Sequence, residues 1–147
     1  MKSSKPSKKQ SILGLIPLFN VLQEQGIDPE TVLHGRGLSL ENMSGAAVID
    51  QSVELDIVSD VISLVDDPIL GVKVGSNVTF TSYGIYAMLL MSAPTFLETI
   101  KVGEQFQSLS LLFSKMSLHF ERDWVEVRYT LPDAEPKLRA FIADRDL

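Results

Sequence analysis

Apolar residues recur every three or four positions along much of this chain, a spacing that predicts helices. The clearest case is "QSVELDIVSDVISLVDD", residues 51–67. Acidic and hydroxyl side chains separate its apolar positions, so the segment predicts an amphipathic helix with one buried face. That face carries Ile57, Val58, Val61, Ile62 and Val65.

The first 37 residues predict two further helices. Pro17 lies within the first of them, where it either kinks the helix or occupies its first turn, and Gly26 is a suitable stop. Asp28 and Pro29 then predict the start of a short second helix, ending within 35–37. The apolar positions of the first helix are Ile12, Leu15, Ile16, Phe19 and Leu22.

The segment 66–75 has two signals that disagree. Leu70, Val72 and Val74 alternate with other residues as in a strand. Asp-Asp-Pro at 66–68 is typical of a capped helix start, so capping favours a short helix that ends at Gly75.

The densest apolar run is Ile85–Met91, which fits a helix or a strand equally well. Ser-Ala-Pro-Thr at 92–95 then predicts the entry to a helix over 94–108. We expect the run and this helix to be two core elements at the centre of the domain. One side of the second helix carries Gly103, which would let another backbone approach closely, together with Phe96, Ile100 and Phe106.

After Leu109 the apolar period shortens to two, which predicts two strands joined by a turn at 121–123. Leu118, Phe120, Val125, Val127, Tyr129 and Leu131 are expected to face the core, and His119, Glu126 and Arg128 to face outward. A helical pattern begins again at Lys137 and runs to the chain end. The predicted class is α+β: a mainly helical first two-thirds, a short antiparallel hairpin and a C-terminal helix.

Charge is distributed unevenly. Residues 1–10 hold four of the 13 basic residues and no acid, so the other 137 residues carry 9 basic and 19 acidic side chains. We expect residues 1–10 to form a disordered basic tail and residues 11–147 to form a single domain. An acidic body repels a phosphate backbone. The helix–glycine–helix outline of residues 12–37 is therefore not interpreted as a DNA-reading unit, because Asp28 and Glu30 would face phosphates.

Several function classes find no support. The apolar runs are shorter than the roughly 20 residues that cross a bilayer, and Pro17 interrupts the stretch that resembles a secretory signal. We expect no membrane contact and a cytoplasmic location. The chain has no cysteine and two histidines. No nucleophile or acid–base constellation stands out, so no catalytic residue, metal or cofactor is predicted.

Two segments resemble a known family. "DDPILGVKVG" and "YGIYAMLLMSAPTFLETI", followed by a hairpin ending in "WVEVRYTL", resemble the N-terminal effector-sensing (arabinose-binding-like) domain of AraC/XylS-type bacterial transcription regulators. The matching positions are Asp67, Pro68, Leu70, Gly71, Val72, Lys73, Val74, Gly75, Gly84, Ser92, Ala93, Pro94 and Thr95, and Phe96 replaces a usual leucine.

The resemblance implies a domain that senses a small molecule and forms a homodimer. DNA would be bound through a C-terminal helix-turn-helix module that this chain lacks, and the sensing domain itself is expected to be truncated at its C-terminus. The alternatives are a ligand-independent interaction module and, with least support, a small enzyme built from scattered acids.

A ligand pocket is mostly apolar with a few polar anchors. Tyrosines combine an apolar body with a hydroxyl, and Arg128 could pair a carboxylate, although a surface pair with Glu126 or Glu121 is the simpler role for it. The predicted ligand-binding residues are Tyr83, Tyr86, Met88, His119 and Arg128, with Gln105 and Gln107 as further residues to test.

The charge distribution yields a direct prediction. The purified 147-residue chain should not bind duplex DNA in a gel-shift experiment at low salt, where electrostatic binding is strongest. Tight binding there would contradict the assignment of DNA contact to a separate module.

Overall fold

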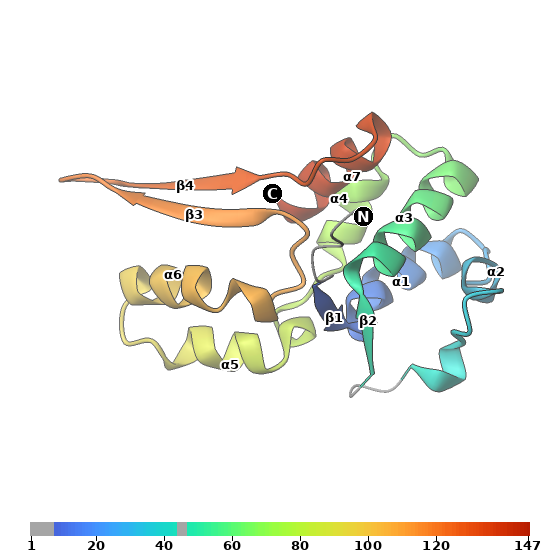
Figure 1. Ribbon diagram of the computed structural model, residues 1–147, viewed down its shortest axis with the longest axis horizontal. Helices are drawn as coiled ribbons and strands as arrows, with labels where there is room; N and C mark the ends of the chain where they lie inside the picture. Colours follow the sequence, from blue (N-terminus) through green and yellow to red (C-terminus); the bar gives the residue numbers. More distant parts are fainter. Residues whose placement is uncertain (1–7, 44–46) are drawn as a thin grey trace, which may run out of the picture.

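The computed structural model describes residues 8–43 and 47–147 and has the predicted α+β class (Figure 1). Helices occupy most of the first hundred residues, an antiparallel hairpin follows, and a helix ends the chain. Short 3₁₀ helices lie at Ile12–Leu15, Leu40–Asn42, Phe80–Tyr83 and Gln107–Leu109.

The elements form two groups. The first, the helical body, contains α1 (Ile16–Glu24), α2 (Glu30–Leu33), α3 (Gln51–Val65), α4 (Leu70–Ser76) and α7 (Pro136–Asp146), with β1 (Lys9–Ser11) paired to β2 (Val48–Asp50). The second, the extension, contains α5 (Ile85–Ser92), α6 (Phe96–Gln105) and the hairpin of β3 (Lys115–Phe120) and β4 (Val125–Thr130). Figure 1 shows the body on the right and the extension on the left.

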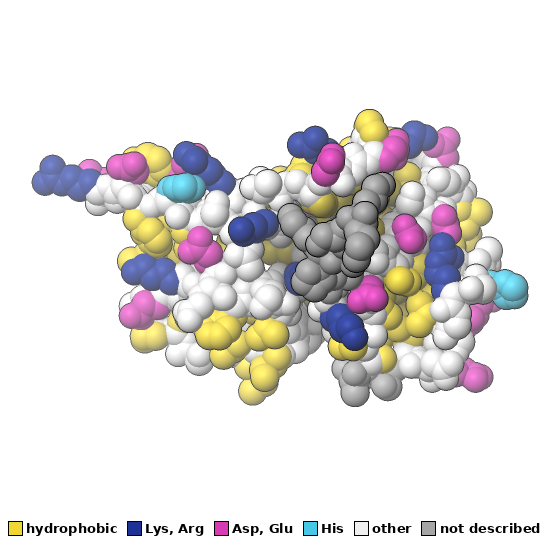
Figure 2. Space-filling model, viewed as in Figure 1, with side chains coloured by type: hydrophobic (Ala, Val, Ile, Leu, Met, Phe, Trp, Pro, Cys, Tyr) yellow, Lys and Arg dark blue, Asp and Glu magenta, His cyan; other side chains and the backbone are white. Residues whose placement is uncertain are grey.

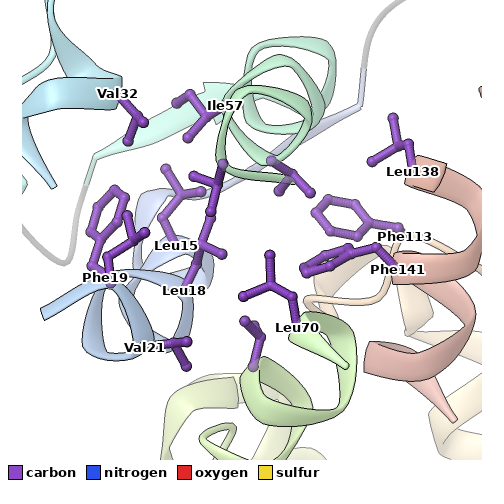
Figure 3. Packing of buried hydrophobic residues seen from close by; sticks show 14 of the residues in the cluster. Leu15, Leu18, Phe19, Val21, Val32, Ile57, Leu70, Phe113, Leu138 and Phe141 are labelled. Atoms are coloured by element: carbon purple, nitrogen blue, oxygen red, sulfur yellow. The ribbon is translucent and has the colours of Figure 1, made fainter. Parts of the chain in front are cut away.

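The body encloses an apolar core to which α3 contributes the face predicted from the sequence. Ile57, Val58 and Val61 are at most 2% exposed. Phe113, from the segment that precedes β3, lies beside Phe141 of α7 in this core (Figure 3). The core thus joins α1, α3, α4 and α7 to one segment from outside the body. Burying each of these side chains stabilises the fold by about 1.5–3 kcal/mol.

Two glycines bring α7 directly onto α4. A Cβ atom added at Gly71 would lie 2.6 Å from the carbonyl oxygen of Phe141, and one at Gly75 would lie 2.8 Å from that of Arg145. These distances leave no room for a side chain. The spacing of four residues puts both glycines on one face of α4, so the backbones of α4 and α7 touch along a full helical turn.

The start of the chain corrects one expectation. Residues 8–10 were assigned to a disordered tail, but Lys9–Ser11 is β1, and Gln10 is 4% exposed. Pairing with Val48–Asp50, some forty residues away, provides the backbone partners for this segment. Neither strand was predicted, because three residues carry too little periodicity. Residues 1–7 of the predicted tail lie outside the described residues.

The structure resolves both ambiguous segments of the body. Pro17 lies in the first turn of α1 rather than at a kink. Residues 70–76 are the helix α4, and the Oδ1 atom of Asp67 accepts a hydrogen bond from the Ile69 amide at 3.0 Å. The prediction of a short helix here is confirmed, but the helix begins at Leu70 rather than at Pro68, and Asp67 caps the turn before it.

The apolar run 85–91 is a helix, α5, but the expectation that it lies in the core is wrong. Tyr86 and Ala87 are its buried residues, whereas Ile85, Met88 and Met91 are 67–73% exposed. One side of α5 packs on α6, and no described element covers the other side. Hydrophobic side chains accordingly gather on the surface over α5 (Figure 2).

Gly103 of α6 is buried, but not against another backbone as predicted. An added Cβ would lie 3.3 Å from the Tyr86 hydroxyl oxygen and 3.5 Å from side-chain atoms of Leu90 and Met116. The absence of a side chain at Gly103 therefore makes space for a tyrosine. Phe96, expected on the same packed side, is 81% exposed.

The hairpin has the two predicted strands and a turn that includes 121–123, although the first strand begins at Lys115 rather than directly after Leu109. His119 pairs with Glu126, and Ser117 pairs with Arg128, so the three residues expected outside share one face. The opposite face is less buried than predicted: Phe120, Val127 and Tyr129 are 37–48% exposed. The hairpin projects beyond the body, and α6 lies along one edge of it (Figure 1).

The close contact between Gly71 and α7 predicts that adding one methyl group at this position destabilises the fold. Gly71→Ala should lower the free energy of unfolding by about 1–3 kcal/mol, because α7 must move to admit the new Cβ. Chemical denaturation measures this change. Val72→Ala is the matched control on the exposed side of α4, where a change within about 0.5 kcal/mol is expected. Equal effects of the two substitutions would contradict the contact.

Candidate functional site

A cleft of about 400 Å³ lies between the body and the extension. We call it the central cleft. The body contributes Gln51 and Lys8, the residue before β1, and the extension contributes the end of α6 and the start of β3. Its lining residues are Lys8, Gln51, Glu104, Gln105, Gln107, Ser108, Leu112, Phe113, Ser114 and Lys115.

A buried ion pair fixes the segment that forms one wall of the central cleft. The Oδ2 atom of Asp146 accepts hydrogen bonds from the amides of Phe113 (3.0 Å) and Ser114 (2.8 Å) and from the Ser114 hydroxyl (2.7 Å). Its Oδ1 atom accepts from Arg145 Nη1 at 2.6 Å. The last turn of α7 therefore holds residues 113–114 through charge-assisted hydrogen bonds, which are the stronger kind.

Arg145 adds two contacts to the same segment. Its Nη2 atom donates to the Leu111 carbonyl at 2.9 Å, and its guanidinium lies 4.3 Å from the centre of the Phe113 ring. The side chains of Arg145 and Asp146 are 4% and 0% exposed. A buried pair with this many partners is compensated, whereas removal of one member would leave an unpaired buried charge.

Glu54 of α3 is a second buried acid beside this pair. Burial raises the pKa of Glu54 to about 7, against the opposing effects of Arg145 and Lys8. Gln10, with its amide oriented to satisfy both neighbours, donates to Glu54 Oε2 at 2.7 Å and accepts from Lys8 Nζ at 3.1 Å. Burial also lowers the pKa of Lys8, which lines the central cleft. A chain of polar contacts thus runs from the cleft to the interior.

The sequence contains a signal for the burial of Glu54, which was not among the predicted site residues. Glu54 precedes Ile57 and Val58 by three and four residues, so it belongs to the apolar stripe of α3. An acid on such a stripe is a candidate for burial. Lys8 and Gln10 gave no comparable signal, because their burial depends on the pairing of β1 with distant residues.

A second cavity, of about 300 Å³, lies where α3 ends and α4 meets α7. Its apolar wall includes Leu70 and Phe141, and its rim includes Asp66, Asp67, Asp144 and Lys137. Asp67 is engaged there by the Ile69 amide and by Lys73 at 2.6 Å. The rim is therefore acidic, while the central cleft carries two lysines.

The structure does not bring the five predicted ligand residues together. Tyr83 and Tyr86 lie side by side, with ring centres 5.9 Å apart, and the Tyr86 hydroxyl donates to the Gly103 carbonyl at 2.9 Å. Burial raises the pKa of both phenols. Met88 is 70% exposed on α5.

His119 and Arg128 lie on the outer face of the hairpin, where Arg128 pairs with Glu126 at 2.6 Å as the simpler interpretation predicted. That hydrogen bond lowers the pKa of Glu126. None of the five residues lines either cavity, and ligand contact by them stays a prediction. Gln105 and Gln107 do line the central cleft.

The comparison with protein families decides the identity of this fold. Residues 26–147 match the family model described as the arabinose-binding domain of AraC transcription regulator, N-terminal. The chain belongs to this family. Its members are regulatory domains of transcription regulators rather than enzymes.

Two curated relatives are longer proteins described as HTH-type transcriptional regulators. One is an HTH-type transcriptional regulator of Mycobacterium bovis and the other an HTH-type transcriptional regulator of Mycobacterium tuberculosis. Each is 24% identical over 132 residues, which are 88% of this chain and 38% of the relative. The chain thus spans well under half the length of the curated relatives it matches.

Four of the residues that carried the family resemblance have structural roles in this AraC-type domain, as packing positions or helix and turn caps. Gly71 and Gly75 admit α7, and Asp67 caps the turn before α4. Thr95 caps α6, since its Oγ1 atom accepts from the Glu98 amide at 3.2 Å. No helix among the described residues is long and apolar enough to cross a membrane.

Glu54 predicts a pH dependence of stability. Its folded pKa of about 7 lies above its ordinary value of 4.5. Between these values the native state holds a proton that the unfolded chain has released, so the free energy of unfolding falls as pH rises. The slope is at most about 1.4 kcal/mol per pH unit. Glu54→Gln should remove this slope.

Urea denaturation across this pH range tests the prediction. The wild type should lose stability relative to Glu54→Gln as pH rises from about 4.5 to about 7, and the difference should then stay constant. Glu24→Gln, a substitution of an exposed acid, is the control. A difference that is the same at every pH would show that Glu54 ionises normally in the folded protein.

Proposed function

We propose that this chain is the effector-sensing domain of a cytoplasmic AraC/XylS-type regulator and that a small metabolite binds in the central cleft. Binding would alter dimerisation of the domain, or DNA binding by an attached module. The observation that carries this proposal is the position of the central cleft, whose walls come from the body and from the extension. Its volume lies within the range of small-molecule sites.

The lining of the central cleft indicates the chemistry of the ligand. Lys8 and Lys115 are its cationic residues, in a chain whose net charge is −6. Glu104, the acidic lining residue, uses its Oε1 atom to accept from the Leu118 amide at 2.8 Å. Gln51 and Ser108 add neutral hydrogen-bonding groups. A small carboxylate with further hydroxyl or amide groups fits this set.

The fold offers a route from the ligand to the rest of the protein. Residues 113–114 form part of the cleft wall and are held by Asp146 of α7. A ligand that binds one placement of the extension better than another would shift the equilibrium toward it, by as much as its affinities for the two differ. The module that binds DNA in a full regulator would respond to that shift.

A second candidate function rests on a different observation. Ile85, Met88 and Met91 present an exposed apolar surface on α5. Surfaces of this kind mark contacts with other proteins. A ligand-independent interaction module would use this surface and would show no response to small molecules.

Thermal shift with a panel of small carboxylates separates the two candidates. A carboxylate at about 100 times its Kd should raise the Tm by about 5–10 °C. Lys115→Ala should reduce the shift by at least about half, since it removes a charge-assisted hydrogen bond. Lys137→Ala, at the rim of the other cavity, is the matched control and should leave the shift unchanged.

Two results would contradict the proposal. A shift lost in Lys137→Ala and kept in Lys115→Ala would assign the ligand to the cavity between α4 and α7. No stabilisation by any carboxylate would favour the interaction module.

A further inference from the structure

The two edges of the β3–β4 hairpin differ in how their backbone groups are used. Along β3, the Leu118 amide donates to Glu104 at 2.8 Å, and the Met116 amide donates to Gln107 Oε1 at 2.9 Å. The Gln107 side-chain nitrogen also donates to the Met116 carbonyl at 2.9 Å. Side chains from α6 and from the turn after it thus take the place of a neighbouring strand and close this edge.

The same contacts show which groups of β4 point outward. The amides of Met116 and Leu118 point away from β4. Met116 pairs with Tyr129 and Leu118 pairs with Val127, so these two pairs are not joined by backbone hydrogen bonds. In such pairs the backbone groups of both residues point away from each other. The Glu121 amide donates a hydrogen bond to the Trp124 carbonyl at 2.9 Å. Glu121 and Trp124 are therefore a hydrogen-bonded pair at the turn, and counting from them gives the same alternation of bonded and non-bonded pairs along the hairpin.

Val125, Val127 and Tyr129 therefore direct their amide and carbonyl groups to the outer edge of β4. Among residues 8–43 and 47–147, no backbone or side-chain group hydrogen-bonds to these atoms. In Figure 1, β4 forms the upper margin of the extension. Charged side chains, proline and bulges are the usual protections of such an edge. Val125–Thr130 contains no lysine, proline or bulge, and its two charged residues, Glu126 and Arg128, have opposite signs.

The side chains of β4 are complementary to a second, antiparallel copy of β4. A two-fold axis at Val127 would place each Glu126 opposite the partner strand's Arg128. On the other face it would place Val125 opposite Tyr129, an aliphatic–aromatic pair. Opposite charges and aromatic–β-branched pairs both stabilise cross-strand neighbours.

Neighbouring registers lack this complementarity. A shift of the axis to Glu126 would set two glutamates opposite each other, and a shift to Arg128 would set two arginines opposite each other. Like charges in facing positions are destabilising. The alternation of Glu126 and Arg128 thus selects the register centred on Val127, in which the outward amides and carbonyls of 125, 127 and 129 all find partners.

We propose that the chain forms a two-fold dimer through antiparallel pairing of β4 with β4 of a second copy, centred on Val127, which joins the two hairpins into one four-stranded sheet. The inference deepens the dimerisation included in the proposed function and rests on it. No residue of β4 lines the central cleft. Ligand binding in the cleft and dimerisation through β4 can therefore be tested independently of each other.

Charge reversal at exposed positions tests the interface without disturbing the core. The side chains of Glu126 and Arg128 are 38% and 57% exposed. Sedimentation velocity over a range of concentrations should show a monomer–dimer equilibrium for the wild type. Glu126→Arg and Arg128→Glu should each weaken dimerisation by about ten-fold, because each makes both facing pairs like-charged.

Complementation makes the test specific. An equimolar mixture of the two single variants should restore dimerisation to within about three-fold of the wild type, as should the double variant with both charges exchanged. Lys137→Glu and Asp66→Lys change the net charge equally at another exposed pair. They should dimerise like the wild type, alone or mixed, which separates the facing pairs from a general effect of charge.

Backbone protection gives an independent readout. Hydrogen exchange at the amides of Val125, Val127 and Tyr129 should slow as the concentration rises through the dimerisation range. A wild type that stays monomeric at every accessible concentration would overturn the proposal. A dimer that both single variants leave unchanged, with these three amides exchanging freely, would overturn it as well and would leave the sensing function intact.

Discussion

The contact between the backbones of α4 and α7 at Gly71 and Gly75 is the constraint on which the arrangement of this domain depends. Gly75 touches the carbonyl of Arg145, so it sets the position of the turn that carries both Arg145 and Asp146. From that position Asp146 reaches the amides of Phe113 and Ser114. A side chain at either glycine would displace α7 from α4, and with it the groups that hold the segment before β3.

This constraint gives the buried charges a structural role. The side chains of Arg145 and Asp146 are buried, but each has several hydrogen-bond partners, so the cost of desolvating them is offset where they lie. Glu54 beside them has fewer hydrogen-bond partners, and burial raises its pKa to about 7. Together they form a polar interior behind the central cleft, in contact with Lys8 and Ser114 of its lining. The body and the extension are therefore joined by directional hydrogen bonds as well as by the insertion of Phe113 into the apolar core.

Local pattern was sufficient to predict elements whose environment follows from their own sequence. The face of Ile57, Val58 and Val61, the helix entry at 92–95 and the alternation of His119 with its neighbours all appear as expected. The family resemblance likewise rested on short motifs, and the match over residues 26–147 confirms it. The motif glycines proved to be packing positions, which a spacing of four on a short helix permits but does not require.

What the sequence did not reveal depends on contacts between distant segments. Gln10 is buried because β1 pairs with residues near 49, and the apolar residues of α5 are exposed because no described element packs on their side. The residues of the central cleft come from positions 8, 51 and 104–115, and no periodicity connects them. Individual polar residues such as Tyr83 and Arg128 were plausible anchors, but hydrophobic pattern alone does not say which of them share a cavity.

Native-state hydrogen exchange of a Gly75→Ala variant measures directly whether the position of α7 on α4 holds the segment before β3. If the seating of α7 on α4 holds the segment before β3, the amides of Phe113 and Ser114 should lose protection together with those of α7. If α7 loses protection in the folded variant while the amides of Phe113 and Ser114 stay as protected as in the wild type, the segment is held by other contacts, and the contact between α4 and α7 does not control it.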